Sequence, residues 1–577
     1  MKKYAMLTVK GVIGLLPPSL KSRLKKNAKL TEFYSRSLQR SGLFYGFPSK
    51  KKRMAMYKDF LRKQDAVLSG NVSNERVNVV IFGSKNAQAT LASLKHNEQV
   101  NHVVVIEHET SNVNAPGHGQ LRNNTQVVST FNDAIAALDL SLPLLMLNEG
   151  DELTKRALAT FVNFLTDYPL VYCDTDKQSK ADRPSEPNFF PAWNPDLHFS
   201  SAYVSTGVLM SPALLAQLNT SICNKLTTIA QLVARFWLNG ITNTIGHVPF
   251  TLVHAHKNKA KEKAYLSGVA HEIKVGGRAS VSVNNELRIN QVSWLSKEQP
   301  LVSLIIPTKD AWELVKACIE SIQQKTTYTN YEILLIDNGS TDETSLAYFS
   351  QLATQPKVRV LPYPGPFNYS AINNYGVKHA NGSIIGLVNN DIEVISPNWL
   401  TDMVAHAQRE DIGCVGAKLL YSDGRIQHAG VVLGYGGGAG HAHKYFPRYH
   451  PGYLKRLVAT QNYSAVTAAC LLVKRSHFDA VGGLDEVNLT VAFNDVDFCL
   501  RVRELGVRNL YCAEAELYHH ESVSRGLDIS PEKAARFNKE LRYLKNSWQS
   551  IIDADPAYNP NLTRKRENFS LKIKEEY

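Results

Sequence analysis

The sequence predicts an α/β protein with two related domains in tandem, each built on a mostly parallel sheet. In the second half, an apolar run at 301–306, a helical pattern to about 325 and another apolar run at 331–336 form a β-α-β unit. The first half shows the same order more faintly between 77 and 147. Each copy ends on an acidic turn, at Asp151 and at Asp391, and this repeat predicts the tandem arrangement.

The individual elements follow from hydrophobic periodicity and from the turn residues between apolar runs. In the first copy we expect strands at 77–82, 102–106, 126–129 and 143–147, and helices near 86–94 and 131–138. In the second copy we expect, after the first β-α-β unit, a strand at 358–361, a helix at 370–379 and a strand at 384–388. Parallel sheets bind ligands at the carboxyl ends of their strands, so the turns that follow these strands are candidate sites.

Charge divides the 577 residues into a basic start and a neutral body. Residues 1–63 hold 17 Lys and Arg against two acidic residues, which leaves 48 basic and 50 acidic side chains elsewhere. A neutral body argues against nucleic acid as a partner. Residues 256–299 show no sustained period and are predicted to be a linker. The expected parts are a basic amino-terminal segment (1–70), a first domain (71–255), the linker (256–299), a second domain (300–530) and a carboxy-terminal helical tail (531–577).

Cysteine usage and hydropathy indicate a cytoplasmic protein. The seven cysteines form no Cys-x-x-Cys pair, which fits neither a disulfide framework nor a thiolate zinc site. The start of the chain imitates a signal peptide, but Lys10 interrupts its apolar stretch and Pro17 and Pro18 end it, so we expect it to be retained. A short apolar segment followed by many basic residues is attracted to anionic membranes. We therefore expect contact with the inner face of the cell membrane; a solvated basic tail is the alternative.

Three polar turns follow strands of the second domain, at 307–310, 337–342 and 389–391. A carboxylate such as Asp337 can accept a hydrogen bond from a base N–H or a ribose hydroxyl, and Asp391 can hold a divalent cation against a diphosphate. Each turn alone could be explained by turn formation or helix capping. Three of them in one domain favour a shared ligand crevice.

Two carboxylates, Asp495 and Asp497, lie just before a helix predicted at 498–505. Residues at i and i+2 cannot share a helix face. One carboxylate can therefore enter the crevice as a general base, while the other caps the helix or pairs with Arg501 or Arg503. The alternative is a doubly capped helix start.

The histidine pair His519 and His520 follows an apolar stretch at about 510–517. Either ring could complete a metal site with Asp391, although a structural role is as frequent for such residues. The glycine-rich stretch 434–441 looks too mobile for a strand; it could close over an acceptor, and a plain flexible connection is the alternative.

The motifs of the second domain resemble those of family 2 glycosyltransferases with the GT-A fold, a Rossmann-like fold. The resemblance is greatest to bacterial enzymes that build O-antigen and other surface polysaccharides. It runs in order through IIPTKD, LLIDNGSTD, FNYSAINN, LVNNDIEV, FNDVDFCLR and YHHESVSRG, between about 300 and 526. The first domain more weakly resembles the amino-terminal GT-A-like domain often paired with it, through LNEGDEL and LVYCDTDK.

The resemblance implies roles for particular residues. Asp495 aligns with the general base, with Asn494 where the family has Glu. Asp391, in a turn that begins with Asn389 instead of the family's first Asp, would bind Mg²⁺ or Mn²⁺ together with His519, and His520 is the less favoured ligand. The residues implied to bind the nucleotide-sugar are Pro307, Thr308, Asp310, Asp337, Asn374, Asn389 and Asn390.

By this resemblance the protein is expected to move a sugar from a nucleotide-sugar donor to a lipid-linked acceptor glycan, with inversion of configuration. Gly150 stands where the family carries an acid, and 227–240 has no acidic pair, so catalysis is expected in the second domain alone. The alternatives are a non-catalytic nucleotide-sugar-binding or scaffold protein and a nucleotidyltransferase. A nucleotidyltransferase would need a Gly-rich basic loop after its first strand, and the segment PTKDAWE found there is neither Gly-rich nor basic.

Overall fold

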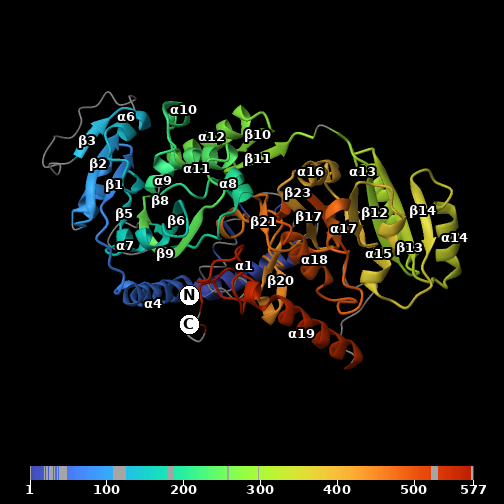
Figure 1. Cartoon of the computed structure of the whole chain (residues 1–577). Coiled ribbons are helices and arrows are strands. Elements are labelled where there is room, and N and C mark those ends of the chain that lie inside the picture. The colour runs from blue at the N-terminus through green and yellow to red at the C-terminus, as the bar shows by residue number, and fades with distance from the viewer. Residues whose placement is uncertain are drawn as a thin grey trace.

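The computed structural model describes residues 2–17, 20, 24, 30, 33, 34, 37, 48–95, 97–107, 125–177, 187–256, 259–296, 298–520, 531–572 and 576. Two sheets organise this part of the chain, one near each end of the molecule, with the glycine-rich hairpin and the carboxy-terminal tail between and below them (Figure 1). Helices cover both faces of the sheets, as expected where most strands run parallel.

The first sheet has the order β3-β2-β1-β4-β8-β6-β9-β5, with β7 paired to β6. Among its described strands, β1 to β4, β6 and β9 run in one direction. The bounds are β1 Val77–Phe82, β2 Val100–Ile106, β3 Thr125–Val128, β4 Leu144–Asn148, β5 Glu152–Leu153, β6 Leu170–Lys177, β7 Pro187–Asn188, β8 Val208–Met210 and β9 Gly246–Ala255.

The second sheet repeats that order strand for strand, as β14-β13-β12-β15-β22-β17-β23-β16, with β18 paired to β17 and β21 paired to β23. The bounds are β12 Val302–Thr308, β13 Tyr331–Asp337, β14 Val358–Pro362, β15 Ile384–Val388, β16 Ile392–Val394, β17 Ile412–Leu420, β18 Ile426–His428, β21 Gln461–Tyr463, β22 Cys470–Lys474 and β23 Arg508–His519. The predicted fold class, an α/β protein with two related, mostly parallel sheets, is confirmed.

Both faces of the second sheet are buried. Leu304 and Ile306 of β12 pack into one hydrophobic cluster, while Ile305 between them packs into another on the opposite face. Helix α13 shows the matching pattern, since Val315, Cys318, Ile319 and Ile322 recur at helical spacing and are fully buried. A strand buried on both sides reads as a continuous apolar run, and this is why the sequence predicted β12 and β13 so directly.

The helices of the two domains occupy corresponding places between strands. Those of the first domain are α5 Ala87–Leu94, α6 Phe131–Ala136, α7 Ala157–Phe164, α8 Pro195–Ser201, α9 Pro212–Leu215, α10 Thr220–Cys223 and α11 Ile229–Leu238. Those of the second are α13 Trp312–Lys325, α14 Glu343–Leu352, α15 Tyr369–His379, α16 Trp399–Ala407, α17 Arg475–Ala480 and α18 Asn494–Arg503.

Residues 256–299, predicted to be a linker because they show no sustained period, contain the helix α12 (Lys259–Val275) and the hairpin β10 (Ala279–Asn284) and β11 (Ile289–Trp294). This stretch therefore has regular structure that its periodicity did not indicate. Buried residues of α12 pack against α11, and Glu272 accepts hydrogen bonds from Arg235 of α11 at 2.7 and 2.8 Å. The Lys and Glu residues of α12 hid this narrow apolar face.

The amino-terminal segment contains two described helices, α1 (Lys2–Leu15) and α4 (Lys50–Leu68). Helix α4 packs on the first domain: the Tyr57 hydroxyl donates to Asp176 at 2.8 Å, and the Gln64 amide exchanges two hydrogen bonds with the backbone of Thr251. Residues 50–68 are thus a structural part of the first domain. Within the described part of the chain, none of the helices has the length and hydropathy of a membrane-spanning segment.

The tail begins with α19 (Pro531–Asp553) and continues as an irregular strap. Asp555 accepts hydrogen bonds from the Ser464 hydroxyl and the Leu433 N–H in the second domain. Four residues further on, the Asn559 amide donates to Asp174 in the first domain at 2.9 Å. The strap therefore fastens the two domains to one another.

Candidate active site

The three polar turns meet at the carboxyl ends of the parallel strands. Thr308, the last residue of β12, lies opposite Asp337, the last residue of β13, in the strand register. The Asn390 side chain, which follows β15, donates to the Thr308 hydroxyl at 3.0 Å. The topology therefore brings together residues from the three turns that the sequence singled out, with Pro307 next to Thr308 in the same strand.

Asp310 connects two of these turns through backbone hydrogen bonds. Its Oδ1 accepts from the N–H groups of Thr341 and Asp342 at 2.7 and 2.9 Å, where α14 begins. Its own N–H donates to the Ser340 hydroxyl at 2.6 Å. Asp310 and Ala311 both have positive φ angles, 51° and 56°, which is a strained conformation for residues other than glycine. The carboxylate thus holds the loop geometry around Asp337.

Asp337 is held in place by Ser340, whose N–H donates to Oδ1 at 3.0 Å and whose hydroxyl contacts the same oxygen. The neighbouring Asn338 is buried and donates to the carbonyls of Tyr363 and Gly365. The half-buried Asp337 carboxylate therefore has a fixed position at the end of the sheet.

His519 is placed beside Asp391 by strand pairing. Ile392 of β16 lies opposite His519 of β23, and the Nε2 of His519 lies 3.2 Å from Asp391 Oδ1 and 3.2 Å from the amide of Asn389. Successive strand residues point to opposite faces. His520 accordingly contacts Glu393 at 3.2 Å and Ser422 at 2.7 Å instead.

The buried pair Asp391 and His519 has the donor chemistry to share a divalent cation with a diphosphate. Mg²⁺ is usually held by one or two carboxylates together with substrate phosphates, and imidazole is a common ligand of transition metals. The Nδ1 of His519 is also buried without a hydrogen-bond partner among the described residues. Within that part of the chain, no group of three or more His, Cys, Asp and Glu side chains is arranged to bind a metal by itself.

Asp495 is half-buried at the start of α18. Its Oδ2 accepts from the Ala468 N–H at 3.1 Å, and burial raises the pKa of its carboxyl above the usual value. Asp497 is engaged elsewhere: Arg501 donates to one oxygen and Trp548 of α19 to the other, both at 2.8 Å. The two carboxylates therefore have different environments, and Asp495 is the one beside the loop that leads to the strand ends.

Tyr369 joins these two regions. Its hydroxyl, at the start of α15, lies 3.1 Å from Asn389 Oδ1 and 3.2 Å from the Ala468 carbonyl. Ala468 in turn holds Asp495 through its N–H. One side chain thus links the turn of Asp391 to the loop of Asp495. Sequence reasoning did not identify it, because nothing in the periodicity marks a tyrosine on the first turn of a helix as a bridge.

Asn374 has a structural partner. Its amide donates to the Leu484 carbonyl at 2.9 Å and accepts from the Leu484 N–H at 2.9 Å. It therefore fixes the loop that follows α17, close to Gly483, where a Cβ atom would lie 2.6 Å from the Asn374 side chain.

The glycine-rich stretch is an ordered hairpin. β19 (Val431–Leu433) pairs with β20 (Ala439–His441) around a short 3₁₀ turn. The prediction that this stretch is too mobile for a strand is wrong. At Gly438 a Cβ atom would lie 2.6 Å from Leu541 of α19, so the glycine allows a close approach of the hairpin to the tail helix.

The first domain keeps the fold of this site but uses its polar groups internally. Asp151 occupies the turn equivalent to that of Asp391, yet it is buried and accepts hydrogen bonds from the N–H groups of Asn148 and His256 and from the Thr206 hydroxyl. In the second domain, Asp495 lies 11 residues before Gly506. Counting 11 residues back from Gly240 in the first domain leads to Ile229, which is fully buried. No carboxylate therefore stands in the place of the base.

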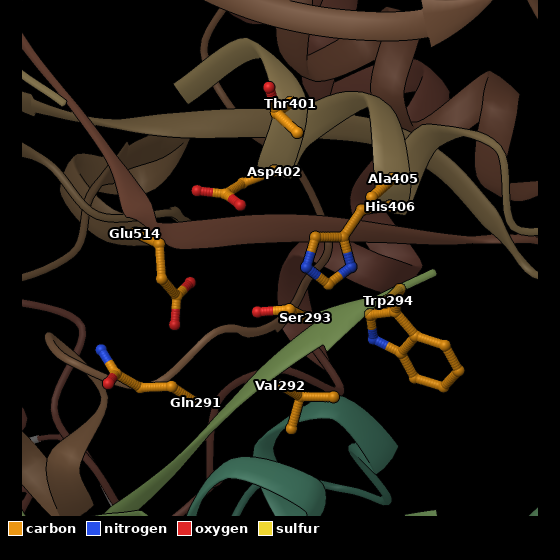
Figure 2. A pocket seen from close by; sticks show the side chains of 9 residues that line it. All are labelled: Gln291, Val292, Ser293, Trp294, Thr401, Asp402, Ala405, His406 and Glu514. Carbon is orange, nitrogen blue, oxygen red and sulfur yellow. The ribbon is translucent and has the colours of Figure 1, made fainter. Parts of the chain in front are cut away.

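A separate cavity of about 110 Å³ lies between β11 and the second domain. Figure 2 shows side chains from β11, α16 and β23 around it, including Asp402, His406 and Glu514. Burial, and then the carboxylate of Glu514, raise the pKa of Asp402 to about 6. Burial lowers the pKa of His406 to about 4, so this ring is neutral near pH 7. Two carboxylates thus share a partly desolvated space at the junction with the hairpin.

Replacing Asp402 by Asn is expected to stabilise the protein at pH 7.5 by about 1 kcal/mol and to have almost no effect at pH 4. The folded state binds the proton more tightly than the unfolded state, so the cost of the ionised carboxylate grows as pH rises from about 4 to about 6. Thermal and urea unfolding midpoints at the two pH values measure this difference. The exposed Glu410→Gln is the control, and an equal shift at both pH values would contradict the prediction.

Two features define the class of this protein. One is the edge of a parallel sheet with polar turns at the strand ends. The other is the half-buried Asp495 carboxylate, which is linked to those turns through Tyr369 and Ala468. They describe an α/β protein that binds a ligand at the ends of its strands. Residues 303–482, which lie within the second domain, match the model of glycosyl transferase family 2, so this domain is a family 2 glycosyltransferase domain.

The chain is similar to proteins of several bacteria. It is 42 % identical over 479 residues to the uncharacterized protein y4gI of Sinorhizobium fredii, with 79 % of this chain and 51 % of the relative covered. It is 34 % identical over 435 residues to the O-antigen biosynthesis protein RfbC of Myxococcus xanthus, with 72 % of this chain and 33 % of the relative covered. The chain therefore spans about half the length of the first relative and a third of the second.

A further relative is matched over most of its own length. It is the N-acetylglucosaminyl-diphospho-decaprenol L-rhamnosyltransferase of Mycobacterium tuberculosis, 27 % identical over 232 residues, with 37 % of this chain and 74 % of the relative covered. Among solved structures, a mannosyltransferase of Pyrobaculum calidifontis in complex with GDP-Man and Mn²⁺ is 14 % identical with a TM-score of 0.34, covering 46 % of this chain and 72 % of the other.

Proposed function

We propose that the second domain transfers a sugar from a nucleotide-sugar donor to a hydroxyl of an acceptor glycan during polysaccharide biosynthesis, with inversion of configuration. The observation that carries this proposal is that two groups of polar residues occupy different places within one family 2 domain. Asp391 and His519 lie together at the strand ends, and Asp495 of α18 accepts a hydrogen bond from the Ala468 N–H. Tyr369 connects the two groups.

The donor would lie along the three turns. Asp337, fixed by Ser340, offers a carboxylate to the base or ribose, and Thr308, Asp310 and Asn390 hold the loops beside it. Asp391 and His519 would hold a Mg²⁺ or Mn²⁺ ion, which would offset the negative charge of the departing diphosphate.

Asp495 would act on the acceptor. Its carboxylate removes the proton of the acceptor hydroxyl while that oxygen forms a bond to the anomeric carbon. The bond from that carbon to the diphosphate oxygen breaks on the opposite face, and the nucleoside diphosphate leaves with the electron pair. A raised pKa makes the carboxylate a better proton acceptor near neutral pH. A single displacement of this kind inverts the configuration.

The acceptor is proposed to be a lipid-linked glycan. RfbC of Myxococcus xanthus is named for O-antigen biosynthesis, and the mycobacterial relative for transfer of rhamnose to a lipid diphosphate sugar. Both names are compatible with such an acceptor, and dTDP-rhamnose and UDP-hexosamines are the first donors to try.

Incubation with a panel of UDP-, dTDP- and GDP-sugars plus Mg²⁺ or Mn²⁺ tests the proposal. Release of the nucleoside diphosphate, dependent on the acceptor glycan, is the expected result. Binding of a donor without turnover, for every donor and for lipid-linked acceptors of different length, would instead favour the alternative, a non-catalytic nucleotide-sugar-binding or scaffold protein.

The amino-terminal segment is proposed to hold the enzyme at the anionic inner face of the membrane. Leu7, Val12 and Leu15 of α1 are exposed, Leu15 by 88 %, and residues 1–47 carry ten Lys and Arg against Glu32. Apolar side chains on a basic helix are suited to the surface of an anionic bilayer.

Deleting residues 1–47 is expected to lower sedimentation with anionic vesicles and transfer to a lipid-linked acceptor, and to leave donor hydrolysis unchanged. A longer deletion to residue 63 would also remove Tyr57 and Phe60 from a buried cluster that includes Phe189 and residues of the second domain, so it would destabilise the protein. Vesicle binding of the full chain should weaken as salt is raised. Unchanged vesicle binding with a lower melting temperature would show that the segment stabilises the fold instead.

Replacing Tyr369 by Phe is expected to lower kcat about tenfold with little change in donor KM. The change removes the hydroxyl that links Asn389 to Ala468 and leaves the ring in place, so the base loop loses its link to the strand ends. Steady-state kinetics and the pH profile of kcat measure this effect. A loss that follows the fraction of unfolded protein, with an unchanged profile, would make Tyr369 merely structural.

A further inference from the structure

An aromatic surface lies beside the proposed base. Phe493 immediately precedes the Asn494–Asp495 pair, and its ring lies 5.2 Å from the ring of Phe537 of α19, between centroids. Phe493 is half-buried, and Phe537 is 38 % exposed. A single exposed apolar side chain is common in folded proteins, and the feature here is the pairing of two aromatic rings next to the Asp495 turn.

The surface is held rigidly by the tail helix. The Glu540 carboxylate, itself buried, accepts hydrogen bonds from the Thr490 hydroxyl and from the N–H groups of Val491 and Ala492. Further along α19, the Trp548 ring N–H donates a hydrogen bond to the Asp497 carboxylate of α18. Both anchors lie on the loop and helix that carry Asp495, so α19 presents Phe537 at a fixed position next to the base.

The glycine-rich hairpin completes this surface. A Cβ atom at Gly438 would lie 3.5 Å from the ring of Phe493 and 2.6 Å from Leu541. The hairpin, the loop before α18 and the tail helix therefore converge on Phe493. These elements come from distant parts of the chain, and none of them contributes to the turns at 307–310, 337–342 and 389–391.

The backbone at Phe493 is strained. Its φ and ψ angles are 60° and 6°, in the left-handed region, although it is a large aromatic residue. Such a conformation is unfavourable for a residue with a Cβ atom and persists where the surroundings impose it, above all at ligand sites. Glycine or asparagine would adopt this conformation more readily than phenylalanine. The position therefore holds an aromatic ring although its backbone conformation is unfavourable for one.

We infer that Phe493 and Phe537 form the subsite for the acceptor sugar, with its C–H face stacked on the aromatic pair and a hydroxyl directed to Asp495. This inference rests on the proposed function. A pyranose ring has an apolar face of C–H groups and a rim of hydroxyls, and the face of an aromatic ring attracts the weakly positive C–H groups. The acceptor fits better here than the donor, because Ala468 and Tyr369 separate Asp495 from the donor turns.

The experiment uses the full chain and octyl glycosides of glucose, galactose, rhamnose and N-acetylglucosamine as probes. Saturation-transfer NMR is expected to show contact of the ring protons with the protein for at least one glycoside. Phe537→Leu and Phe537→Ala should lower that signal and raise the acceptor KM about three- to tenfold, with donor KM and donor hydrolysis unchanged. Asn538→Ala, exposed on the same helix, is the control and should change neither.

Two outcomes would overturn the inference: no glycoside contact in the wild-type chain, or equal signals and equal acceptor KM in wild type and both Phe537 variants. Phe537 is exposed, so loss of folding does not obscure the result, and melting curves check this. If no donor in the panel is ever turned over, the proposed function fails, whereas the NMR comparison still decides whether the aromatic pair binds a sugar ring.

Discussion

Replacing Asp495 by Asn is expected to lower sugar transfer by ~10²–10⁴ while nucleotide affinity stays near that of the wild type. The amide keeps the size of the side chain but cannot take the proton of the acceptor hydroxyl. Transfer rates with saturating donor, together with calorimetric titration of the nucleotide, separate the two effects. In the wild type, the rate should fall as the pH is lowered through the raised pKa of Asp495, because the base must be ionised to act.

Asp497→Asn is the matched control for this change. Asp497 is bound by Arg501 and Trp548, so its replacement should lower the melting temperature and leave the activity per folded molecule nearly intact. Turnover that survives in Asp495→Asn would move the base elsewhere, and Asp497 would then be the first candidate.

The sequence-based prediction succeeded where a local pattern dictates the structure. Strands β12 and β13 are apolar runs because both faces of the sheet are covered, and their last residues, Thr308 and Asp337, lie at the edge where the polar turns begin. The repeat of strands and acidic turns likewise reflects one topology used twice, and the identical strand orders of the two sheets confirm it.

The prediction failed, or stayed open, where long-range contacts decide. Helix α12 has an apolar face of four residues among many polar ones, and only its packing on α11 shows that the face is buried. The choice between His519 and His520 depended on which residue pairs with Ile392 across two strands. Tyr369 contacts residues 20 and 99 positions away, a distance over which no spacing in the sequence is informative.

In the first domain, acidic groups near the strand ends are engaged in contacts within the protein. The strand order is the same as in the second domain. Asp176, however, is hydrogen-bonded to Tyr57 of α4 and to His254, and Asp174 accepts a hydrogen bond from Asn559 of the tail. Both acids lie on β6 and are fully buried. The ends of the chain thus cover part of the first sheet, which explains why its turns resemble a site in sequence and serve as an anchor in the structure.

Replacing Asp391 by Ala is expected to remove metal-dependent donor binding and with it more than 99 % of the transfer activity, about 10² or more in rate. Asp391 is the carboxylate paired with His519, and without it the imidazole would be left to hold the cation with no carboxylate beside it to balance the positive charge. Titration of a nucleoside diphosphate with and without Mn²⁺ measures the loss directly. EDTA should silence the wild-type chain in the same way, and full activity in EDTA would reject the metal altogether.

The equivalent residue of the first domain provides the control. Asp151→Ala would leave two buried N–H groups unpaired, so it would report on stability as much as on function. Asp151→Asn keeps an acceptor oxygen and should leave donor binding and transfer unchanged. Because the two acids occupy the same turn in two copies of one fold, equal losses in Asp151→Asn and Asp391→Ala would show that the first domain also binds a donor, and catalysis could then no longer be assigned to the second domain alone.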